Sequence, residues 1–327
     1  MKQEQEEAFA DFVATRSAAV RRLVQPAFHA RRLEAYARDA VELASARSAS
    51  WHDGQRIDVA AEMSSLTLEV VGRTLFGTDV RGEVEIVSQA QNELLKAFPS
   101  LLTLRGMLGV RFPGRLRRTI RRESERLDGV VERVVATRRE SGDTGDVVSL
   151  LLAVRDEETG EPMPARQVRD EVLTLLLAGH ETTAVALSWV WFELSRTPSA
   201  RRALDAELAS PAVRAALADG AWDRLPFTRA VVAETLRLHP PAYQLGRRPT
   251  EDVVLGPYRF RRGSAVLISP YALHRDERSW GPDAGEFRPS RWLTAEASST
   301  RRRRDSPGGP TSPSVRAAAC ASAPVSP

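Results

Sequence analysis

Residues 172–192 read VLTLLLAGHETTAVALSWVWF, and this stretch decides the fold of the chain. Its only ionisable residues are His180 and Glu181. The stretch is long enough to cross a bilayer as a helix. However, two polar residues at its centre and tryptophans at one end only (Trp189 and Trp191) argue against a membrane span. We therefore expect a helix buried on all sides along the axis of a large helical protein.

The polar residues at the centre of this helix cost stability, because glycine is a poor helix former and an unpaired buried carboxylate is expensive. Two explanations are open. In the first, Thr182 and Thr183 bond back to the preceding turn and Glu181 finds an arginine partner. In the second, Glu181 delivers protons beside the Thr182 hydroxyl, at a bend next to a bound ligand. A zinc-protease site is excluded, since its second histidine would have to stand where the chain has Ala184.

Amphipathic helices are predicted on both sides of the central one, from apolar residues at three- and four-residue spacing. Their ranges are Ala30–Ala46, Val59–Leu75, Arg115–Arg139, Ser199–Leu217 and Phe227–Leu238. The prolines of His239-Pro240-Pro241 end the last of them. Asp252–Phe260 and Ser264–Ser269 then look like two short strands around the turn Arg261-Arg262-Gly263. The predicted fold class is mainly α with a small β-sheet.

Composition excludes several classes of protein. The 327 residues carry a net charge of +4, and the basic residues, nearly all arginine, are mostly spread between acids. Arg301–Arg304 is the densest exception, so we expect a solvated mixed-charge surface and no nucleic-acid binding. Cys320 is the only cysteine, which excludes a disulfide framework and any multi-cysteine zinc or iron–sulfur site within this chain. The first residues do not read as a signal peptide, so the cytoplasm is the expected location.

Four short motifs follow one another along the chain. Residues 178–183 read AGHETT, residues 234–237 read ETLR, Arg247 stands five residues before Asp252, and residues 287–292 read FRPSRW. Glu234 and Arg237 share one helix face. Taken together and in this order, the chain from Arg21 to Trp292 resembles the cytochrome P-450 superfamily of haem-thiolate monooxygenases. The resemblance implies the mainly helical haem fold of that family.

The resemblance also implies roles for particular residues. Glu181 and Thr182 would be catalytic, passing protons towards dioxygen held on the haem. The residues that would contact the cofactor are Ala178, Gly179 and Arg247, the last through a haem propionate. A structural triad behind the haem would consist of Glu234, Arg237 and Arg291. An apolar substrate would be lined by Leu175, Ala242, Tyr243 and Leu245. No residue is assigned as a metal ligand.

The same resemblance implies a cofactor and partners. The cofactor would be heme b, and the co-substrate dioxygen. The substrate would be a hydrophobic small molecule. Nothing in the chain resembles a flavin or nicotinamide domain, so electrons would come from a separate ferredoxin-like protein or reductase.

The family's ligand loop, Phe-x-x-Gly-x-Arg-x-Cys-x-Gly, is not found around Cys320. Aligning Cys320 to its cysteine places Pro313, Arg316, Ala318 and Ser322 at the Phe, first Gly, Arg and last Gly positions. The glycines of the loop allow a tight turn whose backbone N–H groups face the sulfur. Cys320 is therefore expected to be a free thiol and not the iron ligand.

The fold is expected to be incomplete at both ends, without the N-terminal sheet and lid before Arg21–Phe28 and without the C-terminal ligand loop. Residues 1–296 are predicted to form a partial haem domain. Residues 297–327 are predicted to be a disordered or out-of-family tail, since Arg301–Pro327 has no aromatic residue and few aliphatic ones. One hypothesis is that this tail is translated out of frame. Two functions remain open. The chain is either a monooxygenase of hydrophobic molecules or a truncated, non-catalytic remnant that holds no haem-thiolate centre.

Overall fold

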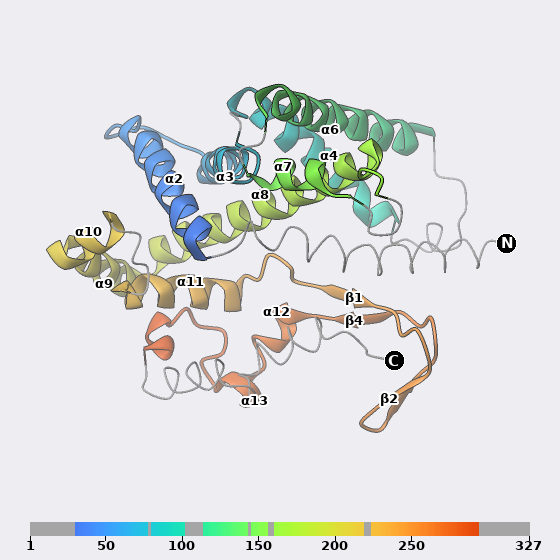
Figure 1. The fold of residues 1–327 in the computed structure, drawn as a ribbon. Coiled ribbons are helices and arrows are strands. Elements are labelled where there is room, and N and C mark those ends of the chain that lie inside the picture. Colours follow the sequence, from blue (N-terminus) through green and yellow to red (C-terminus); the bar gives the residue numbers. More distant parts are fainter. Residues whose placement is uncertain are drawn as a thin grey trace. The chain divides into compact units, whose positions relative to one another are not determined.

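The computed structural model describes residues 30–77, 80–101, 114–142, 145–155, 160–218 and 224–293. These residues form helices and two small sheets, so the mainly α fold class is confirmed (Figure 1). The chain divides into two compact units, one up to Ala184 and one from Val185 onward, with the boundary inside a long helix. The segment Arg21–Phe28, Cys320 and the tail from residue 297 lie outside the described residues.

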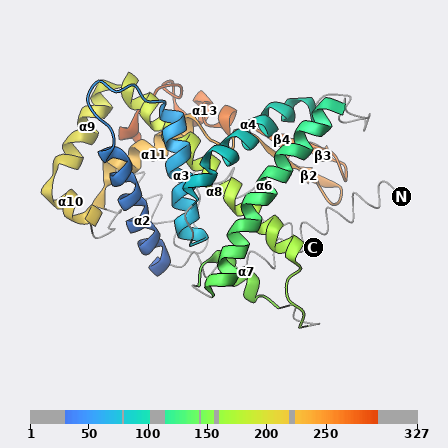
Figure 2. The same cartoon turned by 90° about the horizontal axis from the view of Figure 1, so that it is seen from above.

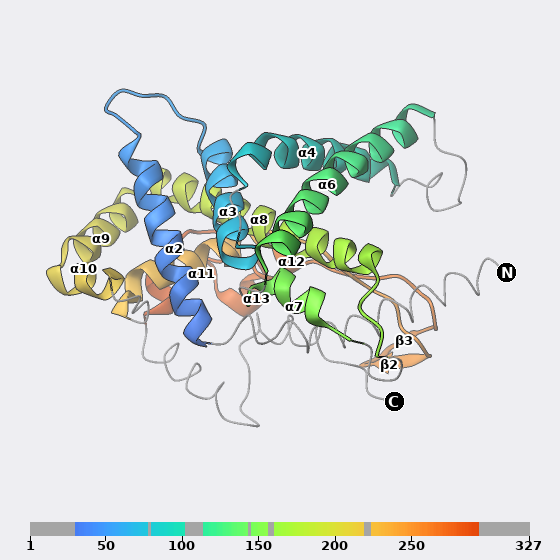
Figure 3. The ribbon, with the colours of Figure 1, turned by 45° about the horizontal axis from the view of Figure 1, so that its top comes forward.

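The first unit is helical throughout its described part. Its elements are α2 (Ala30–Ala49), α3 (Val59–Leu75), the 3-10 turn η2 (Arg81–Glu83), α4 (Val84–Leu101), α6 (Gly114–Ser141), α7 (Val147–Ala153) and the first part of α8 (Ala165–Arg196). Helices α4 and α6 lie side by side (Figure 2), and α2 lies beside α3 (Figure 3). Two of these helices, α4 and α7, were not predicted from the sequence.

Aliphatic side chains from several helices meet in the core of the first unit. Leu68 of α3, Val131 of α6 and Leu176 of α8 are all buried there. Polar side chains fix the helix ends around this core. Asp58 caps α3 by accepting a hydrogen bond from Ala60 N at 2.9 Å. Asp146 caps α7 and also pairs with the buried guanidinium of Arg138 on α6.

Helix α8 is buried along one stripe and not on all sides. Val172, Leu176, His180 and Ala184, spaced four residues apart, are buried, whereas Trp191 is 42% exposed. Only 22% of the most apolar 18-residue stretch is buried, so the expectation of an all-round buried axis is wrong. Within the described residues, α8 is the one helix whose length and composition would allow it to cross a membrane, a property that core helices of soluble proteins share.

The second unit continues with short helices. They are α9 (Pro198–Ala209), α10 (Pro211–Ala218), α11 (Pro226–Leu238), α12 (Pro270–Leu273), α13 (Glu277–Trp280) and the 3-10 turn η4 (Pro289–Trp292). The single helix predicted over Ser199–Leu217 is therefore wrong. Ser210 takes an extended conformation, with ψ 127°, because Pro211 disfavours the helical region for the residue before it.

The strands of the second unit form two antiparallel pairs (Figure 1). Strand β1 (Leu245–Arg247) pairs with β4 (Val266–Ile268), and β2 (Val253–Leu255) pairs with β3 (Tyr258–Phe260). The one strand predicted over Asp252–Phe260 is thus a hairpin. Gly256 reverses the chain with φ +57°, a conformation that suits glycine, and Ser264–Ser269 supplies a partner for β1 instead.

The last turns of α8 are attached to the C-terminal end of α11. Leu194 of α8 and Val231 of α11 share a small apolar cluster. His239, directly after α11, has its Nε2 atom 2.6 Å from the Glu193 carboxylate, and its ring stacks on Trp189 at 3.9 Å. The second unit therefore has its own apolar and polar contacts between these helices.

Candidate functional site

The two threonines at the centre of α8 use their hydroxyl groups within the helix. Thr182 Oγ1 donates to Ala178 O at 2.6 Å, and Thr183 Oγ1 donates to Gly179 O at 3.0 Å. Both side chains are exposed. This is the back-bonding that the first of the two explanations predicted, and it confirms that part of it. The hydroxyl oxygens keep lone pairs that can still accept a hydrogen bond.

The carboxyl group of Glu181 behaves differently from its neighbours. It is half-buried, and within the described part of the chain no hydrogen bond or ion pair reaches it, so the expected arginine partner is wrong for these residues. Burial raises the pKa of this carboxyl above its ordinary value. A half-buried acid with a raised pKa beside a hydroxyl is suited to hold and pass on a proton.

His180 is fully buried in the first unit, on the face of α8 that meets α3. Its Nε2 atom lies 2.9 Å from Ser64 Oγ, and that oxygen lies 3.1 Å from Ser88 Oγ on α4. Burial lowers the pKa of the imidazole, which favours the neutral ring. These three polar side chains therefore connect α8 to α3 and α4. Sequence reasoning gave His180 no role, although its place four residues after Leu176 on the buried stripe was a signal.

Gly179 allows α8 to approach α3 closely. A Cβ atom at this position would lie 3.1 Å from Val71 Cγ2, closer than ordinary van der Waals contact. Leu175, one turn earlier, is half-buried and packs against the core of the first unit, whereas Ala178 is exposed. Gly179 thus has a packing role here. The cofactor role of Ala178 and Gly179 and the substrate-lining role of Leu175 stay predictions.

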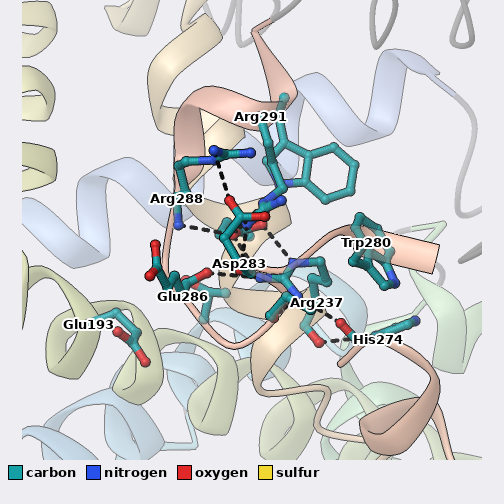
Figure 4. Close-up of polar contacts among 12 residues, drawn as sticks. Glu193, Arg237, His274, Trp280, Asp283, Glu286, Arg288 and Arg291 are labelled. Carbon is teal, nitrogen blue, oxygen red and sulfur yellow. Dashed lines mark hydrogen bonds and ion pairs between the residues drawn. The ribbon is translucent and has the colours of Figure 1, made fainter. Parts of the chain in front are cut away.

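In the second unit, one buried carboxylate gathers donors from two segments. Figure 4 shows three of the arginines around it, Arg237, Arg288 and Arg291. The carboxylate belongs to Glu234 of α11, which is fully buried. Arg237 Nε and Nη2 each donate to it at 2.9 Å, and Arg291 Nε donates at 2.8 Å. Arg288 N donates at 3.0 Å and Trp292 Nε1 at 2.8 Å. The three residues of the predicted triad therefore meet. Trp292 is a further donor that the sequence did not assign.

Arg237 extends the network beyond Glu234. Its Nη1 atom donates to His274 O at 2.7 Å and to Ala284 O at 2.6 Å, while Nη2 donates to Glu286 O at 3.0 Å. Its guanidinium also lies over the Trp280 ring, 5.1 Å from the centroid. Burial alone would raise the pKa of Glu234, but hydrogen bonds from Arg237 and the other donors outweigh it and hold the pKa below its ordinary value. The carboxylate is therefore charged and fully paired.

The other predicted site residues of the second unit lie at and just before β1. Arg247 is exposed, and its Nη1 atom donates to Gly246 O at 2.7 Å. Ala242 is exposed, Tyr243 is 61% exposed and Leu245 is half-buried. These residues belong to a different unit from Glu181 and Thr182. Their haem and substrate contacts stay predictions.

An open pocket in the first unit contains none of the predicted site residues. Its lining comes from α6 and the first turns of α8, and includes Val131, Val135 and the ion pair of Asp128 with Arg169. Within the described ranges there is also no cluster of three or more histidine, cysteine or acidic side chains that could hold a metal ion.

Comparison with known proteins decides the family. The family model described as Cytochrome P450 matches residues 4–307 of this chain. The chain belongs to the cytochrome P450 family. This confirms the resemblance seen in AGHETT, ETLR and FRPSRW.

Individual relatives agree with the family. The chain is 40% identical over 281 residues to the cyclooctatin synthase of Streptomyces melanosporofaciens, covering 85% of this chain and 61% of that protein. It is 33% identical over 292 residues to the pentalenene oxygenase of Streptomyces avermitilis, covering 86% and 63%. It is 32% identical to a cyclooctat-9-en-7-ol 5-monooxygenase of S. melanosporofaciens over 287 residues, covering 86% and 62%. The chain thus spans about three fifths of the length of these relatives.

The family implies a haem group, and the donors of this chain can be tested against it. Glu181 fits the oxygen side, since its carboxyl is half-buried and has no hydrogen-bond partner among the described residues. The iron side of a haem-thiolate centre needs a cysteine thiolate held in a glycine turn. Cys320 is the only cysteine, and proline, arginine, alanine and serine stand where the loop needs its other residues. The thiolate donor of this chain therefore does not fit the group.

The close approach at Gly179 generates a packing prediction. Alanine is a better helix former than glycine by about 1 kcal/mol, but its Cβ would crowd Val71. We expect Gly179→Ala to be stabilising when Val71 is also Ala, and not stabilising when Val71 is kept, with a coupling of about 1 kcal/mol. Urea unfolding of the four variants of this cycle measures it. Equal effects in both backgrounds would show that the two helices do not meet at Gly179.

The Glu234 network generates a stability prediction. Glu234→Gln removes the charge that pairs with the buried Arg237 and with Arg291, so it should lower the free energy of unfolding by about 3 kcal/mol. Arg288→Lys is the matched control. Its side chain is 54% exposed and its backbone N–H is retained, so a change within about 0.5 kcal/mol is expected. Chemical denaturation followed by circular dichroism compares them, and equal losses would contradict the network.

The raised pKa of Glu181 generates a pH prediction. The folded state holds this proton more tightly than the unfolded chain, whose carboxyl has the ordinary value of 4.5. The resulting stabilisation is complete below 4.5 and is lost as the pH rises through the folded-state pKa. Glu181→Gln cannot ionise, so its free energy of unfolding should rise relative to the wild type over that range. Thermal unfolding across a pH series measures the difference, and a difference independent of pH would refute the raised pKa.

Proposed function

We propose that this chain is the main part of a haem-dependent monooxygenase that hydroxylates a hydrophobic small molecule of the terpene class. Dioxygen would be the co-substrate, and electrons would come from a separate ferredoxin-like protein or reductase. The observation that carries the proposal is the half-buried carboxyl of Glu181, which no described residue pairs with, beside the Thr182 hydroxyl in a chain of the Cytochrome P450 family.

The names of the relatives support the substrate class. Pentalenene oxygenase and cyclooctat-9-en-7-ol 5-monooxygenase are named for an alkene and for an alkene with one alcohol group. Such molecules offer large apolar surfaces and at most one hydrogen-bonding group, so an apolar site suits them. We propose that Leu175, Ala242, Tyr243 and Leu245 contribute to that site.

The residues of the chain would have separate roles in proton transfer, cofactor binding and structural support. When bound, a haem group supplies the activation of dioxygen. Glu181 would hold a proton at its carboxyl, because burial raises its pKa, and would pass it on beside Thr182. Arg247 would bind a propionate by charge-assisted hydrogen bonds. Glu234, Arg237 and Arg291 would hold residues 283–292 against α11.

A second function is favoured by the neighbours of Cys320. Without a fitting thiolate donor in its own frame, the chain would be a helical remnant that does not hold a haem-thiolate centre. In that case residues 297–327 would stand outside the family, and residues 1–296 would be a partial domain without catalysis.

A spectrum and a product assay test the two functions. Under the first, the enzyme of which this chain is the main part, reduced and exposed to carbon monoxide, shows the long-wavelength Soret band of a thiolate ligand. With a redox partner, that enzyme adds one oxygen atom to cyclic terpene hydrocarbons. Glu181→Gln should then slow hydroxylation about 10²-fold, while Glu171→Gln, on the same helix, should leave it unchanged. If that enzyme takes up no haem, or binds it without the thiolate band, the remnant is supported.

A further inference from the structure

The described contacts of the second unit reach as far as Trp292, and the composition of the chain changes soon afterwards. Arg291 and Trp292 both donate to Glu234, at 2.8 Å each. Past them, Arg301–Pro327 contains five prolines, five serines, five arginines and no aromatic residue. The ligand loop that the donor test found missing would have to follow in this part of the chain. The change of character and the missing loop therefore coincide.

We infer that the −1 reading frame of this part of the gene encodes the missing loop, Phe-x-x-Gly-x-Arg-x-Cys-x-Gly. The inference rests on the proposed function, because that function supplies the haem iron that the loop cysteine would bind. In the −1 frame, each codon consists of the third base of one codon and the first two bases of the next. For most amino acids the first two bases are fixed, GC for alanine, GT for valine and TG for cysteine. The residues of the chain therefore limit what the −1 frame can encode.

The −1 frame permits every required residue of the loop. A −1 codon that ends in the TC of a serine codon can be TTC, which encodes Phe. A −1 codon that ends in the GC of an alanine codon can be GGC, CGC or TGC, which encode Gly, Arg and Cys. The codons that would supply Phe, Gly, Arg, Cys and Gly in order are those ending in the first two bases of Ser314, Ala317, Ala319, Ala321 and Ala323.

This register places the ligand across the codons of Cys320 and Ala321, and it requires that the Cys320 codon is TGT. A second register, two codons earlier, is excluded. It would take its last glycine from the −1 codon that ends in the first two bases of Ala321. Because a cysteine codon ends in T or C, the Cys320 codon allows only TGC or CGC there, which encode Cys or Arg.

The +1 frame cannot encode the loop. A cysteine codon in that frame needs a residue whose codon has T as its middle base, and in Arg301–Pro327 these are Val315 and Val325. The phenylalanine of the loop lies seven positions before the cysteine, and its codon also needs a residue with T as the middle base. Seven positions before Val315 and Val325 stand Gly308 and Ala318, whose codons have G and C as middle bases. The reading frame of the chain itself does not encode the loop residues around Cys320. The −1 frame is therefore the one that can encode the cysteine ligand within this loop.

The encoded loop would supply what this chain's own donors lack. Its glycines would form a tight turn, and the backbone N–H groups of the turn would face the sulfur. The cysteine would then bind the haem iron as a thiolate. Cys320 itself, in the frame of this chain, would not be a ligand.

Two measurements test the inference. The first is the nucleotide sequence of codons 305–327, which should encode the loop in the −1 frame in the register that ends at Ala323. The second compares the chain as it stands with protein from a gene in which one inserted nucleotide, between codons 293 and 312, restores that frame. The restored protein should show the carbon-monoxide band of a thiolate ligand, and should lose it when the loop cysteine is changed to serine. The unrestored chain should lack the band, with or without Cys320→Ser.

The outcomes separate this inference from the proposed function. If the −1 frame does not read as the loop in this register, the inference is overturned, whatever the chain catalyses. If the unrestored chain shows a thiolate band that Cys320→Ser abolishes, the inference is overturned and a haem-thiolate function stands. If the loop is encoded and the band appears, but no terpene is hydroxylated, the inference stands and the proposed substrate class fails.

Discussion

The buried charge of Glu234 is the constraint on which the described part of the second unit depends. A carboxylate taken out of water is tolerated only when its oxygens are paired. Here α11 supplies one partner, Arg237, and residues 288–292 supply the others. Arg237 in turn satisfies backbone carbonyls of residues 274, 284 and 286. A segment with little regular structure of its own is thereby held in one arrangement.

Most of the fold could be predicted where local signals were strong. The period of apolar residues gave α3 (Val59–Leu75) with its observed bounds. It failed at Pro211 and Gly256, where one residue's backbone preference breaks an apolar pattern that otherwise continues. Composition also overstated the burial of α8, because an apolar side chain shows what a helix can bury and not what packs against it. Burial depends on neighbours that are distant in the sequence.

In the candidate site, too, local signals predicted some contacts and tertiary packing decided the others. The pairing of Glu234 with Arg237 follows from their spacing on one helix, and the resemblance added Arg291. Trp292 as a donor to the same carboxylate could not be foreseen, since indole orientation depends on tertiary packing. Nor could the contact of His180 with Ser64, more than a hundred positions apart, or the close approach of Gly179 to Val71. These contacts pack the middle of α8 on one face, while Glu181 has no partner in the part of the chain that the structure describes.

The long sequence separation within the Glu234 network has a consequence for synthesis on the ribosome. The donors Arg288, Arg291 and Trp292 follow Glu234 by 54, 57 and 58 residues. At the usual pace of translation, roughly 3 to 12 s pass between the emergence of α11 and the arrival of its last partner. During that interval the nascent chain carries an acid and an arginine whose final burial is not yet possible. Chaperones and proteases would meet this part of the molecule in an open form at every round of production.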